Sequence, residues 1–451
     1  MTTAPTPPPG RSTARRAIDR SIGALAFPAL GALIAEPLFL IADSAMVGHL
    51  GASPLAGLAV ASAILQTAVG LMVFLAYSTT PLVARRRGAG DLTGAVQAGI
   101  DGLWLALGIG IIVGAALWAV TNPLVAAFNI DAETAAHARA YLAISCLGVP
   151  AMLLVFAASG LLRGLMDTRT PLIVATVAFG ANIALNWVFI YVLGLGVAGS
   201  AIGTVIAQWG MVAVYLVVIA RHARRAGAGA LPRRDGLGHA GRSGWWLFIR
   251  TLGLRAALLV TVFAATSHGT AATAGYQVVF TIFSTAAFAL DALAIAAQAL
   301  VGEALGARNA ERARAVVRRC VFWGIACGIG IGALLAATSP VIGYVFTSDE
   351  RVLEILPAAV LTLGLSLPLG GFVFVLDGVL MGAGDARYLA WTSLVNLAVY
   401  LPVLWALTVL VPSGTAALVA LTAGFTVVFM LARAVTLGLR ARGGRWVVLG
   451  A

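Results

Sequence analysis

Twelve long apolar segments joined by short polar connections constrain the fold of this chain more than any other feature. A helix of about 20 apolar residues crosses the hydrocarbon core of a bilayer. Only 10% of the 451 residues are charged and 61% are hydrophobic, so the expected solvent is lipid. The sequence therefore predicts an all-α integral membrane protein with twelve transmembrane helices. The segments cover approximately 21–46, 54–84, 94–121, 139–162, 170–193, 197–220, 246–267, 270–304, 313–338, 352–381, 388–410 and 413–439.

The basic residues predict the orientation of the chain in the membrane. All 29 are arginines, and they gather before the first segment, after the even-numbered segments and between residues 222 and 245. The alternate connections carry few arginines, and those near 131–133 and 349–354 are mostly acidic. This is the positive-inside pattern, which places both termini in the cytoplasm and suggests the inner (plasma) membrane. It also explains the net charge of +12 better than nucleic-acid binding does, so no nucleic-acid partner is expected.

The two halves of the chain repeat at a fixed offset. Each matching pair is separated by 218 positions (368 minus 150, for example). The pairs are Gly88 and Gly306, Ala89 and Ala307, Pro150 and Pro368, Gly160 and Gly378, Gly164 and Gly382, Asp167 and Asp385, and Arg169 and Arg387. Six spans per half give both halves the same orientation, an arrangement found in alternating-access transporters.

The repeat predicts five regions along the chain. They are a disordered cytoplasmic N-terminus (1–20), an N-lobe (21–221), a cytoplasmic linker (222–245), a C-lobe (246–440) and a cytoplasmic tail (441–451).

Asp43 is the first candidate functional residue, because it lies in an apolar segment. A carboxylate at mid-helix in a membrane costs roughly 2.5–3.5 kcal/mol on insertion scales and usually marks an ion or substrate path. Glu36 lies on the same helical face two turns earlier, and Pro28 and Pro37 offer hinges. The alternative for Asp43 is a residue that merely ends the helix at the outer membrane surface.

Polar residues of the fifth and sixth segments extend this candidate site. Asn182 and Asn186 are four positions apart and therefore share one helical face. We expect them, with Thr204, to join Asp43 in an ion-coupling site. The alternative is that these buried amides and hydroxyls only hold neighbouring helices together.

The second half carries a separate set of candidates. Asp291 and Asp377 lie deep in apolar segments, and Tyr276 and Gln277 are potential cavity-lining residues for a flat organic cation, through stacking and cation–π contact. The alternatives are satisfied structural acids and aromatic anchors at the lipid interface. No catalytic constellation, phosphate loop or metal-ligand spacing is evident, so neither an enzyme nor a bound cofactor or metal is expected.

Several of these motifs resemble one transporter family. The run from Leu40 to Gly51 is similar to the first-helix motif of MATE (multidrug and toxic compound extrusion) proteins in their DinF-like branch. Further similar runs are 164–171, 182–190, 196–204, 290–293 and 376–378, and the likeness covers about residues 20–440.

The resemblance implies a V-shaped, two-lobe antiporter that expels organic cations or other amphiphiles in exchange for H⁺ or Na⁺ across a lipid membrane. Asp43, Asn182 and Thr204 fall on the family's N-lobe site. Asn186 falls where relatives often carry Asp, which favours H⁺ as the coupling ion, with Na⁺ as the alternative. A lipid-linked oligosaccharide flippase is the other alternative, but it would need cationic residues in its cavity, whereas nearly all arginines here are expected in loops.

Overall fold

The computed structural model describes residues 11–450, apart from the side chains of residues 11–14 and Glu36. All regular secondary structure in this part of the chain is helical. It contains twelve helices long and apolar enough to cross a membrane, as predicted. Those of the first half are formed by α1 (Arg11–Gly48), α2 (Ala52–Leu71) with α3 (Phe74–Gly88), α4 (Leu92–Ala119), α6 (Ala132–Ser145) with α7 (Val149–Gly164), α8 (Arg169–Trp187) and α9 (Gly196–Ala226), while α5 (Thr121–Ala126) is short. Those of the second half are formed by α10 (Arg234–Thr266), α11 (Thr270–Gly306), α12 (Ala310–Thr338), α13 (Glu350–Gly382), α14 (Ala386–Leu410) and α15 (Thr415–Ala423) with α16 (Met430–Arg442).

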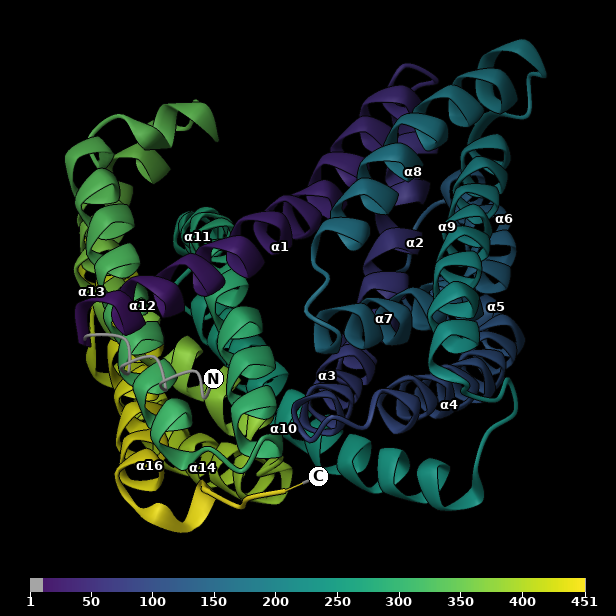
Figure 1. The fold of residues 1–451 in the computed structure, drawn as a ribbon. Helices are drawn as coiled ribbons and strands as arrows, with labels where there is room; N and C mark the ends of the chain where they lie inside the picture. Colours follow the sequence, from purple (N-terminus) through teal and green to yellow (C-terminus); the bar gives the residue numbers. More distant parts are fainter. Residues whose placement is uncertain (1–10, 451) are drawn as a thin grey trace, which may run out of the picture.

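The helices form two lobes that diverge at one end and meet at the other (Figure 1). Helices α2 to α9 build one lobe and α11 to α16 the other, while α10 runs between them at the closed end of the V. This is the two-lobe bundle expected from the sequence.

The lobes meet where α3 crosses α11, and the contact follows the sequence repeat. A Cβ atom added at Gly88 would lie 2.0 Å from the carbonyl oxygen of Glu303, and one added at Gly306 would lie 1.9 Å from that of Arg85. The two contacts are equivalent under the repeat. Gly88 corresponds to Gly306 and Arg85 corresponds to Glu303, because 306 minus 88 and 303 minus 85 are both 218. The backbones approach this closely because glycine has no side chain.

We expect Gly88→Ala to destabilise this junction. The added methyl group overlaps backbone atoms that have no room to move, and such overpacking costs about 1–3 kcal/mol. The matched control is Gly108→Ala in α4, where no atom lies within 4 Å of the added Cβ and where alanine favours the helix. Thermal unfolding of the detergent-solubilised protein should show a lower midpoint for the Gly88 variant only. Equal midpoints would contradict the close crossing.

Helix α1 links the two lobes rather than belonging to one. Near its N-terminus, Asp19 accepts two hydrogen bonds of 2.7 Å from Arg319 of α12 and one of 2.9 Å from Trp323. Farther along, Ala29 packs against Ala292 of α11, and the C-terminal part of the helix packs against α8. The N-terminal part of α1 therefore packs on the C-lobe, on both sides of the N-lobe boundary expected at residue 21.

Part of the segment 1–20, for which the sequence predicts disorder, is helical. Residues 11–20 belong to α1, since the contact of Asp19 with α12 holds that end of the helix. Residues 1–10 lie outside the described part of the chain.

The connection between the two halves is shorter than the expected linker, and it is held by the N-lobe. Only residues 227–233 separate α9 from α10, instead of 222–245. Gln97 of α4 donates to the carbonyl oxygen of Leu231 at 2.9 Å, and the Arg233 amide donates to Asp101 at 2.9 Å. These bonds fasten the linker to the N-lobe, because buried polar groups of α4 find their partners in the linker backbone.

Candidate functional site

Helix α1 directs Asp43 into the interior of the N-lobe. The side chain is 2% exposed, whereas Ile41, two positions earlier, is 65% exposed. Successive helical residues are rotated by about 100°, so one position points into the bundle and its neighbours point away from it. Asp43 is therefore not a solvent-facing residue that ends the helix at the membrane surface.

Three hydrogen-bond donors from three other helices converge on the Asp43 carboxylate. Tyr141 of α6 donates its hydroxyl at 3.1 Å, and Asn186 of α8 donates its amide at 3.0 Å. The hydroxyl of Ser200 in α9 donates to the same oxygen as Asn186. All three side chains are buried, so the carboxylate is held by protein groups from α6, α8 and α9.

The predicted amide and hydroxyl residues form a second layer behind these donors. Asn182 and Asn186 exchange hydrogen bonds of 3.2 and 3.3 Å, and Asn182 also donates to Thr204 at 3.2 Å. The structure therefore brings Asp43, Asn182, Asn186 and Thr204 together. Asn186 is bonded to Asp43, Asn182 is bonded to Asn186, and Thr204 is bonded to Asn182. The side chain of Glu36 lies outside the described residues.

The sequence interpretation missed two of the three groups that bind Asp43. Ser200 precedes Thr204 by four positions and shares its helical face, which is a signal that the i, i+4 rule detects. Tyr141 has no such signal, because nothing in its own helix relates it to residues of α1, α8 or α9.

These contacts suit a carboxyl group that gains and loses a proton. The ionised form accepts hydrogen bonds from Tyr141, Asn186 and Ser200. A hydroxyl both donates and accepts, so the hydroxyls of Tyr141 and Ser200 are also able to accept a bond from the protonated form. Among the described residues, no group of three or more His, Cys, Asp or Glu side chains is placed to hold a metal ion.

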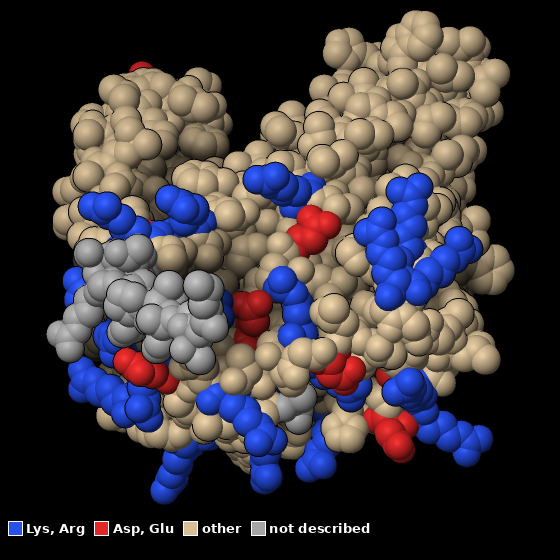
Figure 2. Space-filling model, in the orientation of Figure 1, with Lys and Arg blue, Asp and Glu red and all other residues tan. Residues whose placement is uncertain are grey.

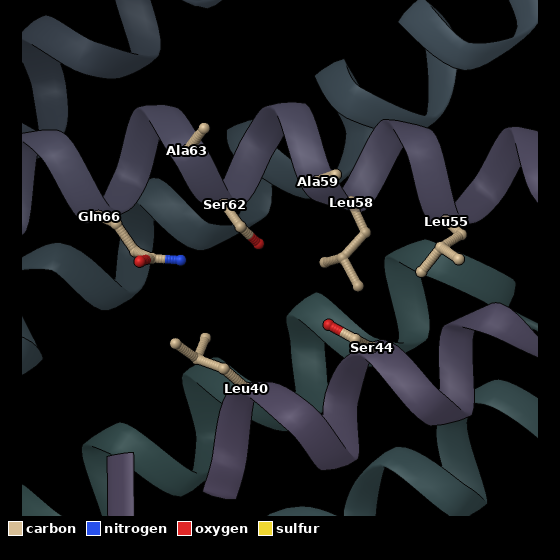
Figure 3. A pocket seen from close by; sticks show the side chains of 8 residues that line it. All are labelled: Leu40, Ser44, Leu55, Leu58, Ala59, Ser62, Ala63 and Gln66. Atoms are coloured by element: carbon tan, nitrogen blue, oxygen red, sulfur yellow. The ribbon is translucent and has the colours of Figure 1, made fainter. Parts of the chain in front are cut away.

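A cavity of about 330 Å³ lies beside this site, between α1 and α2 (Figure 3). Leu40 and Ser44 line it from α1, and Ser62 and Gln66 supply polar groups from α2. Ser44 follows Asp43 directly in the helix, so the cavity lies about a quarter turn around α1 from the buried carboxylate.

In the C-lobe, Asp377 is a paired residue rather than a free acid. Arg250 of α10 forms an ion pair with it and donates a further hydrogen bond at 3.2 Å, and Arg433 of α16 pairs with it at 3.2 Å. All three are buried. Two arginines in membrane-spanning helices were not anticipated, and the expectation that nearly all arginines lie in loops is corrected accordingly.

The other C-lobe candidates do not come together in one site. Tyr276 is buried in α11, and Gln277 beside it is exposed, because consecutive helical residues face different directions. Asp291 is half-buried in the same helix, 15 residues and about 22 Å farther along its axis. The proposed cation site built from these residues is therefore not assembled in this structure.

Comparisons with known proteins agree with this architecture. The model of the MatE family matches residues 28–188 and 248–406 of the chain. The chain is 30% identical over 393 residues to the chloroplastic protein DETOXIFICATION 44 of Arabidopsis thaliana, a match that covers 84% of this chain and 74% of that protein. It is 28% identical over 382 residues to DNA damage-inducible protein F of Escherichia coli K12, covering 82% of this chain and 81% of that protein.

Solved structures show the same fold. The crystal structure of the Vibrio cholerae MATE transporter VcmN in the bent form superposes with a TM-score of 0.87 at 22% sequence identity. The match covers 96% of this chain and 99% of that chain.

Proposed function

The chain belongs to the MatE family, whose members are transporters rather than enzymes, and we propose that it exports small amphiphilic molecules in exchange for protons. The observation that carries this proposal is the buried Asp43 carboxylate with its three converging donors. A carboxylate in a membrane span that is fully enclosed by protein has no role as a surface group and marks an ion path by default. The V-shaped pair of lobes supports alternating access to a site between them.

Helix α1 supports a link between proton binding and movement of the lobes. Asp43 lies in its N-lobe end, and Asp19 anchors its other end to the C-lobe. Pro28 and Pro37 lie between these anchors, and each proline removes one backbone hydrogen bond from the helix. We propose that these two positions act as hinges when the hydrogen bonds around Asp43 rearrange.

Charge distribution supports a place in the plasma membrane with both termini in the cytoplasm. Basic side chains gather over the half of the molecule where the lobes meet, and the diverging ends carry almost none on the face shown in Figure 2. By the positive-inside rule, the closed end of the V is cytoplasmic and the cleft opens outward. The similarity to DNA damage-inducible protein F supports a proposed place in the DinF-like branch.

Sodium coupling is the first alternative. Sodium binds through several oxygen atoms, whereas Asp43 is surrounded by one amide N–H donor and two hydroxyl groups. Asn186 offers a neutral side chain at the position where a second carboxylate would favour a metal cation, so the proton is preferred. A lipid-linked oligosaccharide flippase is the second alternative, and it predicts movement of a diphosphate-linked lipid between leaflets rather than efflux of soluble compounds.

The coupling ion is testable in proteoliposomes. We expect efflux of substrate to follow an imposed pH gradient and to ignore a Na⁺ gradient at constant pH, because one protonatable carboxylate is sufficient for H⁺. Asn186→Asp adds a second carboxylate next to Asp43 and should increase the sensitivity to Na⁺. Transport by the unmodified protein that is driven by Na⁺ alone, with ionophores clamping pH and voltage, would rule out proton coupling.

A further inference from the structure

A second cavity, of about 260 Å³, lies where α12 begins and α16 ends. Three arginines line it: Arg314 and Arg318, one turn apart on α12, and Arg442, the last residue of α16. The other described residues of its wall are Val317, Ala441, Gly443, Gly444 and Trp446, so none of the described lining is acidic. The wall therefore presents three positive charges to one small space and is complementary to an anion.

Acids that contact these two helices bind other arginines. They form the pairs Glu303 with Arg312, Asp19 with Arg319, and Asp385 with Arg440, and none of these six residues lines the cavity. Glu311, one turn before Arg314, is exposed and does not line the cavity either. Arg314, Arg318 and Arg442 are all exposed, so an anion from outside the protein has access to them.

The segment that follows α16 gives the cavity a defined wall. Trp446 is only 3% exposed, and its indole N–H donates to the carbonyl oxygen of Ala441 at 2.9 Å, which folds the chain back on the end of α16. Gly443 and Gly444 form the bend between them and carry no side chain that would fill the space. The space beside the arginines is thus part of the folded structure.

Apolar side chains continue from the cavity toward the middle of the two spans. Phe322, one turn beyond Arg318 on α12, is 53% exposed, and Leu439, one turn before Arg442 on α16, is 64% exposed. Arginines near the ends of spans lie at the level of the lipid headgroups, and the exposed apolar residues next to them face acyl chains. The order of side chains along both helices therefore matches the order of groups in a phospholipid.

The same segment continues to the junction of the two lobes. Arg85 of α3, in the N-lobe, donates to the carbonyl oxygen of Val448. The amide of Gly450 donates to the carbonyl oxygen of Leu305 in α11 at 3.0 Å. A ligand that holds residues 443–446 against α12 therefore also favours the contact between the lobes at the closed end of the V.

We propose that Arg314, Arg318 and Arg442 bind the headgroup phosphate of an anionic phospholipid, whose acyl chains lie along α12 and α16. Arginine presents a planar set of donors that matches phosphate oxygens, and basic pockets between spans on the cytoplasmic side are the usual sites for such headgroups. The inference goes beyond the proposed export function and rests on its placement of the closed end of the V in the cytoplasm.

Native mass spectrometry of the full-length protein in detergent tests the site. Dioleoyl phosphatidylglycerol should bind more tightly than dioleoyl phosphatidylcholine, which has the same acyl chains and no net charge, and it should raise the midpoint of thermal unfolding more. The triple substitution Arg314→Gln, Arg318→Gln and Arg442→Gln should weaken binding of phosphatidylglycerol at least tenfold, and the triple Lys variant should recover part of it.

The matched control replaces three exposed arginines near the end of α9, Arg221, Arg224 and Arg225, by Gln. It removes the same net charge and should leave binding of phosphatidylglycerol unchanged. Should the triple variant at the cavity fail to elute as a folded monodisperse protein, Arg318→Gln alone provides the comparison at an exposed side chain.

Three results would overturn the proposal. They are equal binding of the two lipids, equal losses for the cavity and control variants, and displacement of phosphatidylglycerol by inorganic phosphate at the same concentration, which would assign the cavity to a free anion. Binding that depends on the three arginines, combined with no transport under a pH gradient, would retain the lipid site and refute the export function.

Discussion

Asp43→Asn should abolish uphill transport while leaving the protein folded. Asparagine has the size of aspartate and retains an oxygen acceptor for Tyr141, Asn186 or Ser200, but it does not exchange a proton. The site then stays uncharged at every pH, so the pH gradient no longer shifts the equilibrium between the two arrangements of the lobes. We expect a loss of at least a hundredfold in the initial rate of pH-driven efflux from proteoliposomes.

Two variants control this experiment. Asp43→Glu keeps the ionisable group and should retain partial activity, reduced because the longer side chain no longer fits among its three donors. Ile41→Val changes a residue of the same helix that is 65% exposed and should leave coupling intact. Efflux by the Asn variant at the rate of the unmodified protein, with normal elution on size exclusion, would refute the role of Asp43.

Asp377→Asn should be among the most destabilising single substitutions in the C-lobe. It removes the carboxylate that pairs with both Arg250 and Arg433, and both arginines are buried. Removal of one partner from a buried ion pair costs about 3–5 kcal/mol, because the remaining charge stays desolvated. The midpoint of thermal unfolding should fall strongly, and the additional substitution Arg250→Gln should restore part of it by removing one of the two stranded charges.

The same substitution at Asp385 provides the matched control. Asp385 pairs with Arg440 at 2.6 Å, and the two side chains are 15% and 21% exposed. Solvent reaches this pair, so Asp385→Asn should cost less, nearer the range of about 0–1 kcal/mol that is typical of accessible ion pairs. Equal losses for the two substitutions would show that burial of the Asp377 pairs is not what stabilises the lobe.

The sequence alone determined those properties that depend on residues close together in the chain. Twelve apolar segments predicted the twelve spans because lipid requires about 20 apolar residues per helix. Spacing by four placed Asn182 and Asn186 on one face, and both now lie in the Asp43 network. The repeat of 218 positions predicted equivalent helices, and the crossing of Gly88 and Gly306 follows it.

Tertiary structure alone decided which faces meet. Helical spacing gives the direction of a side chain but not the helix that packs against it, and one apolar face fits several neighbours equally well. Tyr141 reaches Asp43 across 98 positions of sequence, and Arg250 reaches Asp377 across 127. The same lack of long-range information concealed the crossing of α1 between the lobes and the pairing of Asp377 with Arg433. Local periodicity determines the helices and which residues share a face. Packing between distant segments determines which charged side chains lie against each face.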